Sequence, residues 1–328
     1  MGQKIIFLDV DGTLVDYENR LPHSALRALE KARKAGHLIY LATGRSKAEL
    51  YGEISQVAYD GYIGGNGSYI EVADQVVKEE TLSYEETKAI VDWLEARQLE
   101  FYLEANSGLY GSRNFEKRGQ PTMQAYSKSK GKEITTVKEA FPELILGADL
   151  YRSDINKISF ILDSYQDYLD ACLAFPELKL GTWGGVGEEA LFGDVARGNI
   201  NKGNAVSELL AHLGINGKDS LAFGDAKVDI PMLDVAGVGV AMGNGGPEIQ
   251  AMADFITKDV NEDGIWHASN ILTYYNQSNT RSVYKWDFVK TFYGVGQRLP
   301  INVKEVTTKV VVDWPMWMLC PLAKIAFQ

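Results

Sequence analysis

The chain of 328 residues is poor in cysteine and contains no long apolar run. Its two cysteines, Cys172 and Cys320, lie far apart and fit no metal-ligand spacing, so we expect a reducing compartment. No stretch approaches the roughly 20 unbroken apolar residues of a membrane span, and the N-terminus shows no signal-peptide pattern. Basic residues are also scarce, because 33 Lys and Arg stand against 44 Asp and Glu, a net charge of −11. These absences predict a cytoplasmic protein whose main partner is neither nucleic acid nor a membrane, and they leave its oligomeric state open.

The most informative segment runs from Lys4 to Asp16 and reads KIIFLDVDGTLVD. Its apolar residues predict a buried strand that ends in two aspartates, Asp9 and Asp11, two positions apart. That spacing sends both carboxylates to the same side, and Gly12 lets the chain turn away directly after them. Two carboxylates at this separation repel each other unless a cation or a proton lies between them. A polar turn after a strand also contains Asp and Gly, so this segment alone leaves both interpretations open.

Strand and helix patterns alternate on both sides of a different central segment. Apolar strands are expected at residues 4–10, 37–43 and 220–224, and helices at 23–35, after residue 46, and at 201–213. This alternation predicts an α/β fold with a Rossmann-like parallel sheet that binds ligands at the carboxyl ends of its strands. Residues 82–187 mix a helix with short strands and predict an inserted α+β domain. We therefore expect a discontinuous core, residues 1–81 and 188–272, around an insert of residues 82–187.

Residues 273–328 continue neither pattern. This segment has seven Lys and Arg against three Asp and Glu, and it holds three of the six tryptophans. Its apolar run VVVDWPMWMLCPLA is interrupted by Asp313, Pro315 and Pro321, so neither a membrane helix nor a regular strand is expected there. A membrane-interface or partner-binding tail and a family-specific extension both stay open, and the role of the segment is unknown.

Two further segments place phosphate-binding groups at strand and helix ends. Thr43 ends the strand at 37–43 and Gly44 follows it, so a hydroxyl and a glycine amide there can donate to a phosphoryl oxygen. Lys202 opens the helix at 201–213, where its charge suits a transferring phosphoryl group and is mildly unfavourable beside the helix dipole. Each segment alone also fits an ordinary strand-to-helix link or a solvated lysine.

A fourth segment, LAFGDAKVDIPML at residues 221–233, supplies two more carboxylates. Its apolar strand ends at Asp225, and Asp229 follows four residues later. Asp225, the Asp9 carboxylate and the backbone carbonyl of Asp11 together offer the hard oxygen ligands that Mg²⁺ prefers.

In this order the four segments closely resemble the signatures of the haloacid dehalogenase (HAD)-like hydrolase superfamily, and the insert resembles the cap of its Cof-type phosphatase subfamily. The resemblance covers about residues 1–270. It implies an enzyme, a Mg²⁺-dependent phosphatase of small phosphorylated metabolites, in which Asp9 forms an aspartyl-phosphate and Asp11 acts as acid and base. It further implies phosphate contacts from Val10, Thr43, Gly44 and Lys202. The metal ligands it implies are Asp9, Asp11 and Asp225, and Asp229 would support these ligands without binding the ion itself.

One position departs from the family pattern. Val228 stands where the family usually has an Asn that contacts the phosphate, and losing such a contact costs roughly 10²–10³ in rate if nothing substitutes for it. Two alternatives therefore stay open: a non-catalytic protein that binds a phosphorylated metabolite in a regulatory role, and a phosphomutase, which shares the motifs and differs in the cap. No motif in the insert identifies the substrate.

Overall fold

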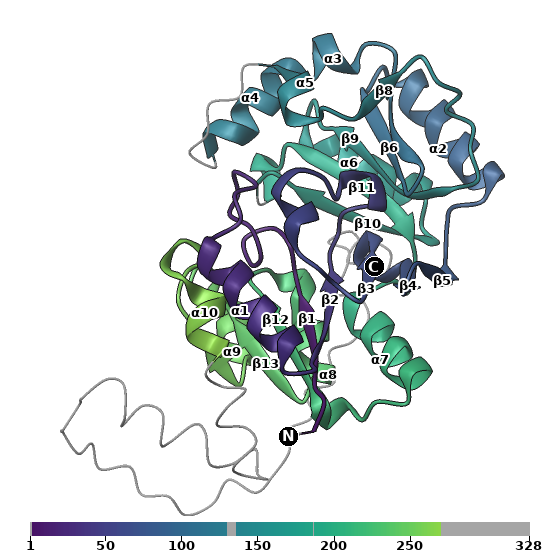
Figure 1. Ribbon diagram of the computed structural model, residues 1–328. Coiled ribbons are helices and arrows are strands. Elements are labelled where there is room, and N and C mark those ends of the chain that lie inside the picture. Colours follow the sequence, from purple (N-terminus) through teal and green to yellow (C-terminus); the bar gives the residue numbers. More distant parts are fainter. Residues whose placement is uncertain (1, 130–135, 186, 270–328) are drawn as a thin grey trace, which may run out of the picture. The chain divides into compact units, whose positions relative to one another are not determined.

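The computed structural model describes residues 2–129, 136–185 and 187–269 (Figure 1). The predicted extension at 273–328 lies outside the described residues, so its expected features stay predictions. Within the described part of the chain, no helix has the length and apolar character needed to cross a membrane.

The first sheet has eight strands in the order β14-β13-β12-β1-β2-β3-β4-β5. Its strands are β1 (Ile5–Leu8), β2 (Leu38–Ala42), β3 (Gly61–Gly64), β4 (Tyr69–Val72), β5 (Gln75–Glu79), β12 (Ser220–Gly224), β13 (Val238–Ala241) and β14 (Phe255–Ile256). All neighbours from β14 to β3 are parallel, whereas β4 and β5 pair antiparallel at one edge. The central strand β1 lies between β12 and β2, so their carboxyl ends meet at one edge of the sheet.

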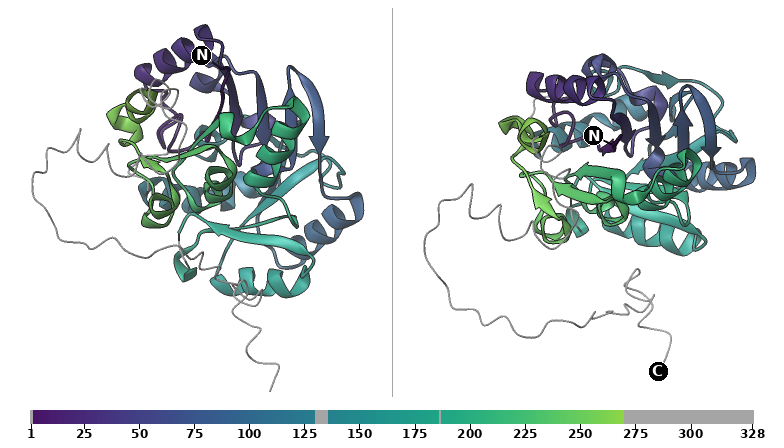
Figure 2. Two further views of the ribbon diagram at one scale, coloured as in Figure 1. Left: turned by 90° about the horizontal axis from the view of Figure 1, so that it is seen from below. Right: turned by 60° about the horizontal axis from the view of Figure 1, so that its bottom comes forward.

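Helices cover both faces of this sheet, as Figures 1 and 2 show. Alternate residues of β1 enter two different apolar clusters, because successive side chains of a strand point to opposite faces. Ile6 and Leu8 pack with α1 (His23–Lys34) and α10 (Gly264–Ser269). Ile5 and Phe7 pack with a second group of helices. These are α7 (Lys202–Leu213), α8 (Ile230–Val235) and α9 (Pro247–Met252).

A second sheet of six strands has the order β10-β11-β9-β6-β7-β8. The strands are β6 (Phe101–Ala105), β7 (Gly108–Gly111), β8 (Leu144–Leu146), β9 (Ile155–Ile161), β10 (Leu178–Trp183) and β11 (Phe192–Arg197). Two helices, α2 (Tyr84–Ala96) and α6 (Tyr165–Ala174), share an apolar cluster with this sheet. Three further helices, α3 (Phe115–Arg118), α4 (Gln120–Ser129) and α5 (Val137–Ala140), contribute to a second cluster. All strand pairs are antiparallel except β7 with β8, which matches the α+β character expected for the insert.

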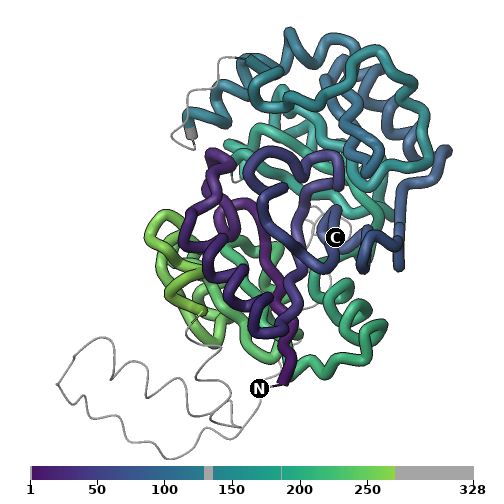
Figure 3. The backbone as a smooth tube through the Cα atoms, viewed as in Figure 1, coloured from purple at the N-terminus to yellow at the C-terminus, as the bar shows by residue number. Residues whose placement is uncertain are grey.

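The strand pairing moves one predicted boundary. β11 pairs with β9 and β10, so the second sheet continues past residue 187 and ends near 197. The glycine-rich residues before β11 connect two antiparallel strands and do not mark a domain boundary. Figure 3 traces the chain from β5 into the second sheet and back to α7. The two chain connections between the first and the second sheet lie side by side, as the hydrogen bond from the guanidinium of Arg197 to the carbonyl of Thr81 at 3.4 Å shows. The division into core and cap stays a prediction, with its second boundary shifted by about ten residues.

A second correction concerns the helix expected after residue 46. The chain forms two short 3₁₀ helices there, η1 (Lys47–Glu49) and η2 (Gly52–Gln56). Leu50 and Tyr51 lie between them, and Gly52, the first residue of η2, has a φ of +66°, a left-handed conformation that does not continue a right-handed helix.

Candidate active site

The turn after β1 is built around its backbone. The amide of Asp9 donates to the carbonyl of Phe223 at 3.0 Å and so joins the turn to β12. The carbonyl of Val10 accepts from the amides of Leu14 and Val15, each at 3.0 Å, which folds the chain back on itself. Gly12 has a φ of +78°, and a β-carbon there would lie 2.4 Å from Oδ2 of Asp225. A glycine is therefore required at this point for both conformational and steric reasons.

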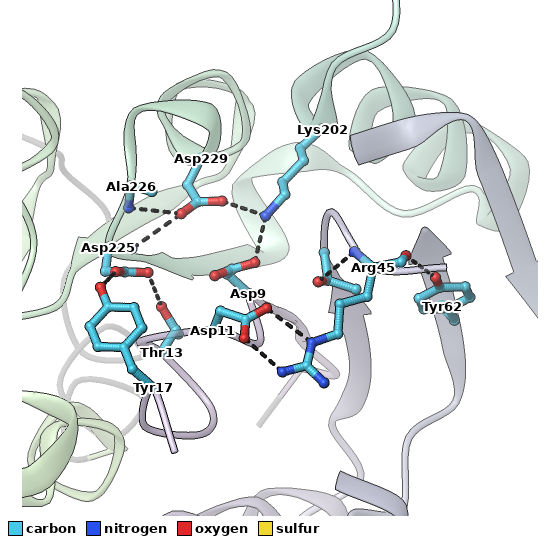
Figure 4. A network of polar contacts seen from close by, with 11 residues as sticks. Asp9, Asp11, Thr13, Tyr17, Arg45, Tyr62, Lys202, Asp225, Ala226 and Asp229 are labelled. Atoms are coloured by element: carbon cyan, nitrogen blue, oxygen red, sulfur yellow. Dashed lines mark hydrogen bonds and ion pairs between the residues drawn. The ribbon is translucent and has the colours of Figure 1, made fainter. Parts of the chain in front are cut away.

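Three carboxylates and one lysine meet beside this turn, as Figure 4 shows. One oxygen from each of Asp9, Asp225 and Asp229 lies within 4.8 Å of the others, and all three residues are buried. Nζ of Lys202 lies 2.5 Å from Oδ1 of Asp9 and 2.5 Å from Oδ1 of Asp229, with 1% of the residue exposed. Burial, followed by repulsion from Asp229, raises the pKa of Asp9 well above its usual range, although Lys202 opposes the shift. This cluster therefore favours the binding of a cation.

Asp229 and Asp225 have different surroundings within the cluster. Oδ2 of Asp229 accepts hydrogen bonds from the amides of Asp225 (3.2 Å) and Ala226 (3.0 Å), while its Oδ1 contacts Lys202. Asp225 instead accepts from two hydroxyls, Tyr17 Oη at 2.6 Å and Thr13 Oγ1 at 3.2 Å. Burial raises the pKa of Asp225 to about 6. Asp229 is thus held by a buried lysine and two backbone amides, whereas Asp225 accepts from two neutral hydroxyls. This difference suits a role for Asp229 in supporting the site and for Asp225 in binding a cation.

Asp11 points toward a different partner. Arg45 binds its carboxylate with two hydrogen bonds, Nε to Oδ2 at 3.0 Å and Nη2 to Oδ1 at 2.6 Å. The backbone of Arg45 is fixed as well, because its amide donates to Thr43 Oγ1 at 3.1 Å and its carbonyl accepts from the hydroxyl of Tyr62. The planar guanidinium fits a carboxylate in this two-point geometry, so Arg45 fixes the orientation of Asp11. This contact of Arg45 was not predicted, although the residue stands in the same short segment after β2 as Thr43 and Gly44.

The remaining predicted residues lie at the ends of neighbouring strands. Thr43 is fully buried after β2, and its amide donates to the carbonyl of Ile63 at 2.9 Å. A β-carbon on Gly44 would lie 3.2 Å from Oδ1 of Asn66, so the loop after β3 comes close to this strand end. Since β1 pairs with both β2 and β12, the predicted residues are brought to one edge of the first sheet. Their individual chemical roles stay predictions.

Val228 lies in the 3₁₀ helix η6 (Lys227–Asp229), directly before Asp229. It is 52% exposed, so it belongs to neither of the apolar clusters of the first sheet. A polar side chain at this position would meet water and would not be trapped in the core.

The donor set fits a small divalent cation. Asp9 and Asp225 supply carboxylate oxygens, the ligands that Mg²⁺ takes in proteins, and no softer ligand belongs to the group. Burial raises the pKa of both carboxylates, and repulsion from Asp229 adds to each rise; a bound cation would relieve that repulsion.

A family model for haloacid dehalogenase-like hydrolases matches residues 6–268, so the chain belongs to this family. It is 25% identical over 289 residues to phosphatase YwpJ of Bacillus subtilis (strain 168), covering 80% of this chain and 98% of that protein. Two solved structures are also similar. BT1666 from Bacteroides thetaiotaomicron, described as a HAD-superfamily phosphatase, has a TM-score of 0.66 and 27% identity, covering 84% of this chain and 95% of its own. The HAD subclass IIB sugar phosphatase BT4131 has a TM-score of 0.64 and 26% identity, and the match covers 83% of this chain and 99% of that one. The predicted family, Rossmann-like fold and enzyme class, a phosphoric monoester hydrolase, are confirmed.

Proposed function

We propose that this phosphatase is Mg²⁺-dependent and that it hydrolyses small phosphorylated metabolites through a phosphoryl group carried on Asp9. The observation that carries the proposal is the position of Lys202, which is buried and contacts the carboxylates of Asp9 and Asp229 at 2.5 Å each. A cation held against a carboxylate at the end of β1 can neutralise an incoming phosphoryl group beside that carboxylate. Asp11, fixed by Arg45, lies two residues further along the same turn.

In the first step, an oxygen of the Asp9 carboxylate attacks phosphorus and forms an acyl-phosphate bond. The bond between phosphorus and the leaving oxygen breaks, and protonated Asp11 transfers its proton to that oxygen. Lys202 and the groups at Thr43 and Gly44 stabilise the charge on the phosphoryl oxygens. Arg45 pairs with the ionised Asp11 carboxylate, so protonation of Asp11 for this step requires that one of these two hydrogen bonds opens.

In the second step, a water molecule attacks the phosphorus of the acyl-phosphate. Asp11, now ionised, takes a proton from this water, and the bond between phosphorus and the Asp9 oxygen breaks. Inorganic phosphate leaves, Asp9 is again a carboxylate, and Asp11 again carries its proton. Asp11 therefore acts first as the acid and then as the base.

Asp9, Asp225 and the backbone carbonyl of Asp11 would hold the Mg²⁺, and Asp229 would support them through Lys202 and the amides of Asp225 and Ala226. The ion supplies positive charge beside the Asp9 carboxylate and the phosphoryl oxygens, which would otherwise repel each other.

A sugar phosphate or a related phosphomonoester is the proposed substrate class. Support comes from the likeness to BT4131, a sugar phosphatase that covers most of this chain. The cytoplasm, predicted from the low cysteine content, is the proposed location.

The test is hydrolysis of an aryl phosphate with Mg²⁺ and with a chelator present, in wild-type protein and in Asp9→Asn and Asp11→Asn. We expect both variants to lose turnover, since an amide is a poor nucleophile and a poor proton donor. After an acid quench, a covalently attached phosphoryl group should be found on wild-type protein and on Asp11→Asn, in which it forms slowly. It should be missing from Asp9→Asn. Asp234→Asn, on the exposed face of α8, is the matched control. Full turnover in Asp9→Asn would contradict the mechanism.

A further inference from the structure

Tyr17 belongs to none of the four motifs, yet its side chain reaches the carboxylate cluster (Figure 4). Its Oη donates to Oδ2 of Asp225 at 2.6 Å, a short hydrogen bond between residues 208 positions apart. The tyrosine is half-buried, whereas the three residues after it are exposed. The contact is therefore specific to this side chain and does not follow from general burial of the segment.

The segment that carries Tyr17 is fixed by its neighbour Asp16. The buried carboxylate of Asp16 accepts from the amides of Glu18 (2.7 Å) and Arg20 (3.0 Å) and from Nε of Arg20 (2.7 Å). These bonds close the loop on both sides of Tyr17, so its backbone cannot shift independently. The ordering of this tyrosine is thus provided by the loop itself.

The hydroxyl of Tyr17 has a second hydrogen-bond partner besides Asp225. Tyr17 forms a hydrogen bond with Asn244, whose Nδ2 donates to the carbonyl of Gly12 at 2.8 Å and whose Oδ1 accepts from the amide of Val260 at 3.0 Å. A β-carbon on Gly12 would come within 2.7 Å of Tyr17 Oη and 2.4 Å of Asp225 Oδ2. The hydroxyl, the carboxylate and the turn after Asp9 are therefore packed without spare room.

Asp225 has a donor on each oxygen, because Thr13 Oγ1 lies 3.2 Å from its Oδ1. Two donors on opposite oxygens fix the plane of a carboxylate. Thr13 is part of the first motif, and Tyr17 supplies the shorter of the two bonds. An aspartate oriented in advance loses less entropy when it binds a cation, and its ligand oxygen already faces the site.

We propose that Tyr17 is a positioning residue that orients Asp225 for the divalent cation and thereby sets the affinity of the site for that cation. The inference rests on the metal site in the proposed function. Outer partners of metal ligands commonly contribute 10-fold to 100-fold to metal affinity, and a hydroxyl bound directly to a ligand carboxylate belongs to this class.

The test is Mn²⁺ binding, followed by electron paramagnetic resonance in the absence of substrate, in wild-type protein and in Tyr17→Phe. The substitution removes one oxygen and keeps the ring. We expect the dissociation constant to rise about 10-fold or more. The thermal unfolding temperature of the metal-free protein should stay close to that of wild type. Tyr59→Phe removes a hydroxyl from another half-buried tyrosine outside the cluster, and it should leave Mn²⁺ affinity unchanged.

Equal Mn²⁺ affinity in wild-type and Tyr17→Phe protein would overturn the inference and leave the metal site itself intact. Tighter binding by Tyr17→Phe would also overturn it, because the hydroxyl would then be competing with the cation for the carboxylate. Absence of Mn²⁺ binding in the wild-type protein would contradict the metal site and, with it, the proposed function. If Tyr17→Phe also lowers the unfolding temperature, Thr13→Ser serves as a second variant, because it keeps the other hydroxyl donor to Asp225. Loss of Mn²⁺ affinity in Tyr17→Phe alone then supports the inference. Equal loss of affinity in both variants would overturn it.

Discussion

Replacement of Lys202 by methionine gives the sharpest test of the buried charge cluster. Methionine has a similar length and no charge, so Lys202→Met leaves Asp9, Asp225 and Asp229 together without their cation. Lys202 is 1% exposed and contacts two of these carboxylates at 2.5 Å each, so solvent cannot replace it. Removing one partner of a buried ion pair typically costs 3–5 kcal/mol. We therefore expect the free energy of unfolding to fall by about 3–5 kcal/mol at neutral pH.

The assay is urea unfolding in the presence of a chelator, repeated with Mg²⁺ and at acid pH. Mg²⁺ should restore part of the lost stability to Lys202→Met, because a cation that binds only the folded state stabilises it. Acid pH should also reduce the difference in the free energy of unfolding between Lys202→Met and wild type. The pKa of Asp9 is already raised by burial and by Asp229, and without Lys202 it rises further, so the folded state takes up protons more readily as the pH falls.

Lys227→Met is the matched control for this experiment. Lys227 pairs with Glu248 on the surface, with 73% of its side chain exposed, and such pairs contribute about 0–1 kcal/mol. If Lys202→Met costs no more than Lys227→Met, the buried cluster does not depend on the lysine, and the reasoning is refuted. Equal losses with and without Mg²⁺ would count against a cation at the carboxylates.

Two further predictions concern Val228 and Glu104. Because Val228 is 52% exposed, Val228→Asn should leave the unfolding temperature unchanged and tighten binding of a metal-fluoride phosphate analogue, measured calorimetrically; unchanged affinity would show that this side chain does not face the phosphoryl site. Burial raises the pKa of Glu104 from 4.5 to about 7, against the attraction of Lys157 at 3.1 Å. The folded state therefore binds the Glu104 proton more tightly than the unfolded state does. The contribution of Glu104 to the free energy of unfolding falls by about 3 kcal/mol as the pH rises from about 4.5 through 7. Glu104→Gln should remove this pH dependence of the free energy of unfolding, measured with urea. If that free energy depends on pH in the same way in both proteins, the raised pKa of Glu104 is contradicted.

Most of the predicted site residues lie at ends of parallel strands, whereas Lys202 opens α7 and Asp229 closes η6. The end of an apolar run can be identified locally, and parallel strands bring their carboxyl ends to one edge. Asp9 and Asp225 are 216 residues apart, yet their approach follows once β1 and β12 are neighbours. The same logic placed Thr43 after β2. For this reason motif order and strand pattern were sufficient to identify the family and its fold.

The unpredicted contacts depend on the paths of loops, which follow no such rule. Arg45 reaches Asp11 across 34 residues, and Tyr17 reaches Asp225 across 208. The sequence pattern gives no direction for either side chain. The error after residue 46 has the same origin, because an alternation of strands and helices led to the expectation of a helix there, and the left-handed conformation of Gly52 cannot be read from that alternation. The boundary at 187 is early because the pairing of β11 with β9 and β10 joins segments that are distant in the sequence.

The charges around Asp9 also explain why the proposed chemistry needs both cations. With all side chains ionised, Asp9, Asp225 and Asp229 carry three negative charges, and Lys202 returns one positive charge. Arg45 and Asp11 form a pair that is neutral by itself. The cluster would therefore repel a phosphate group, and a divalent cation brings its charge to zero. Under the proposed function, Lys202 makes the cluster stable enough to fold, and Mg²⁺ makes it able to accept an anion.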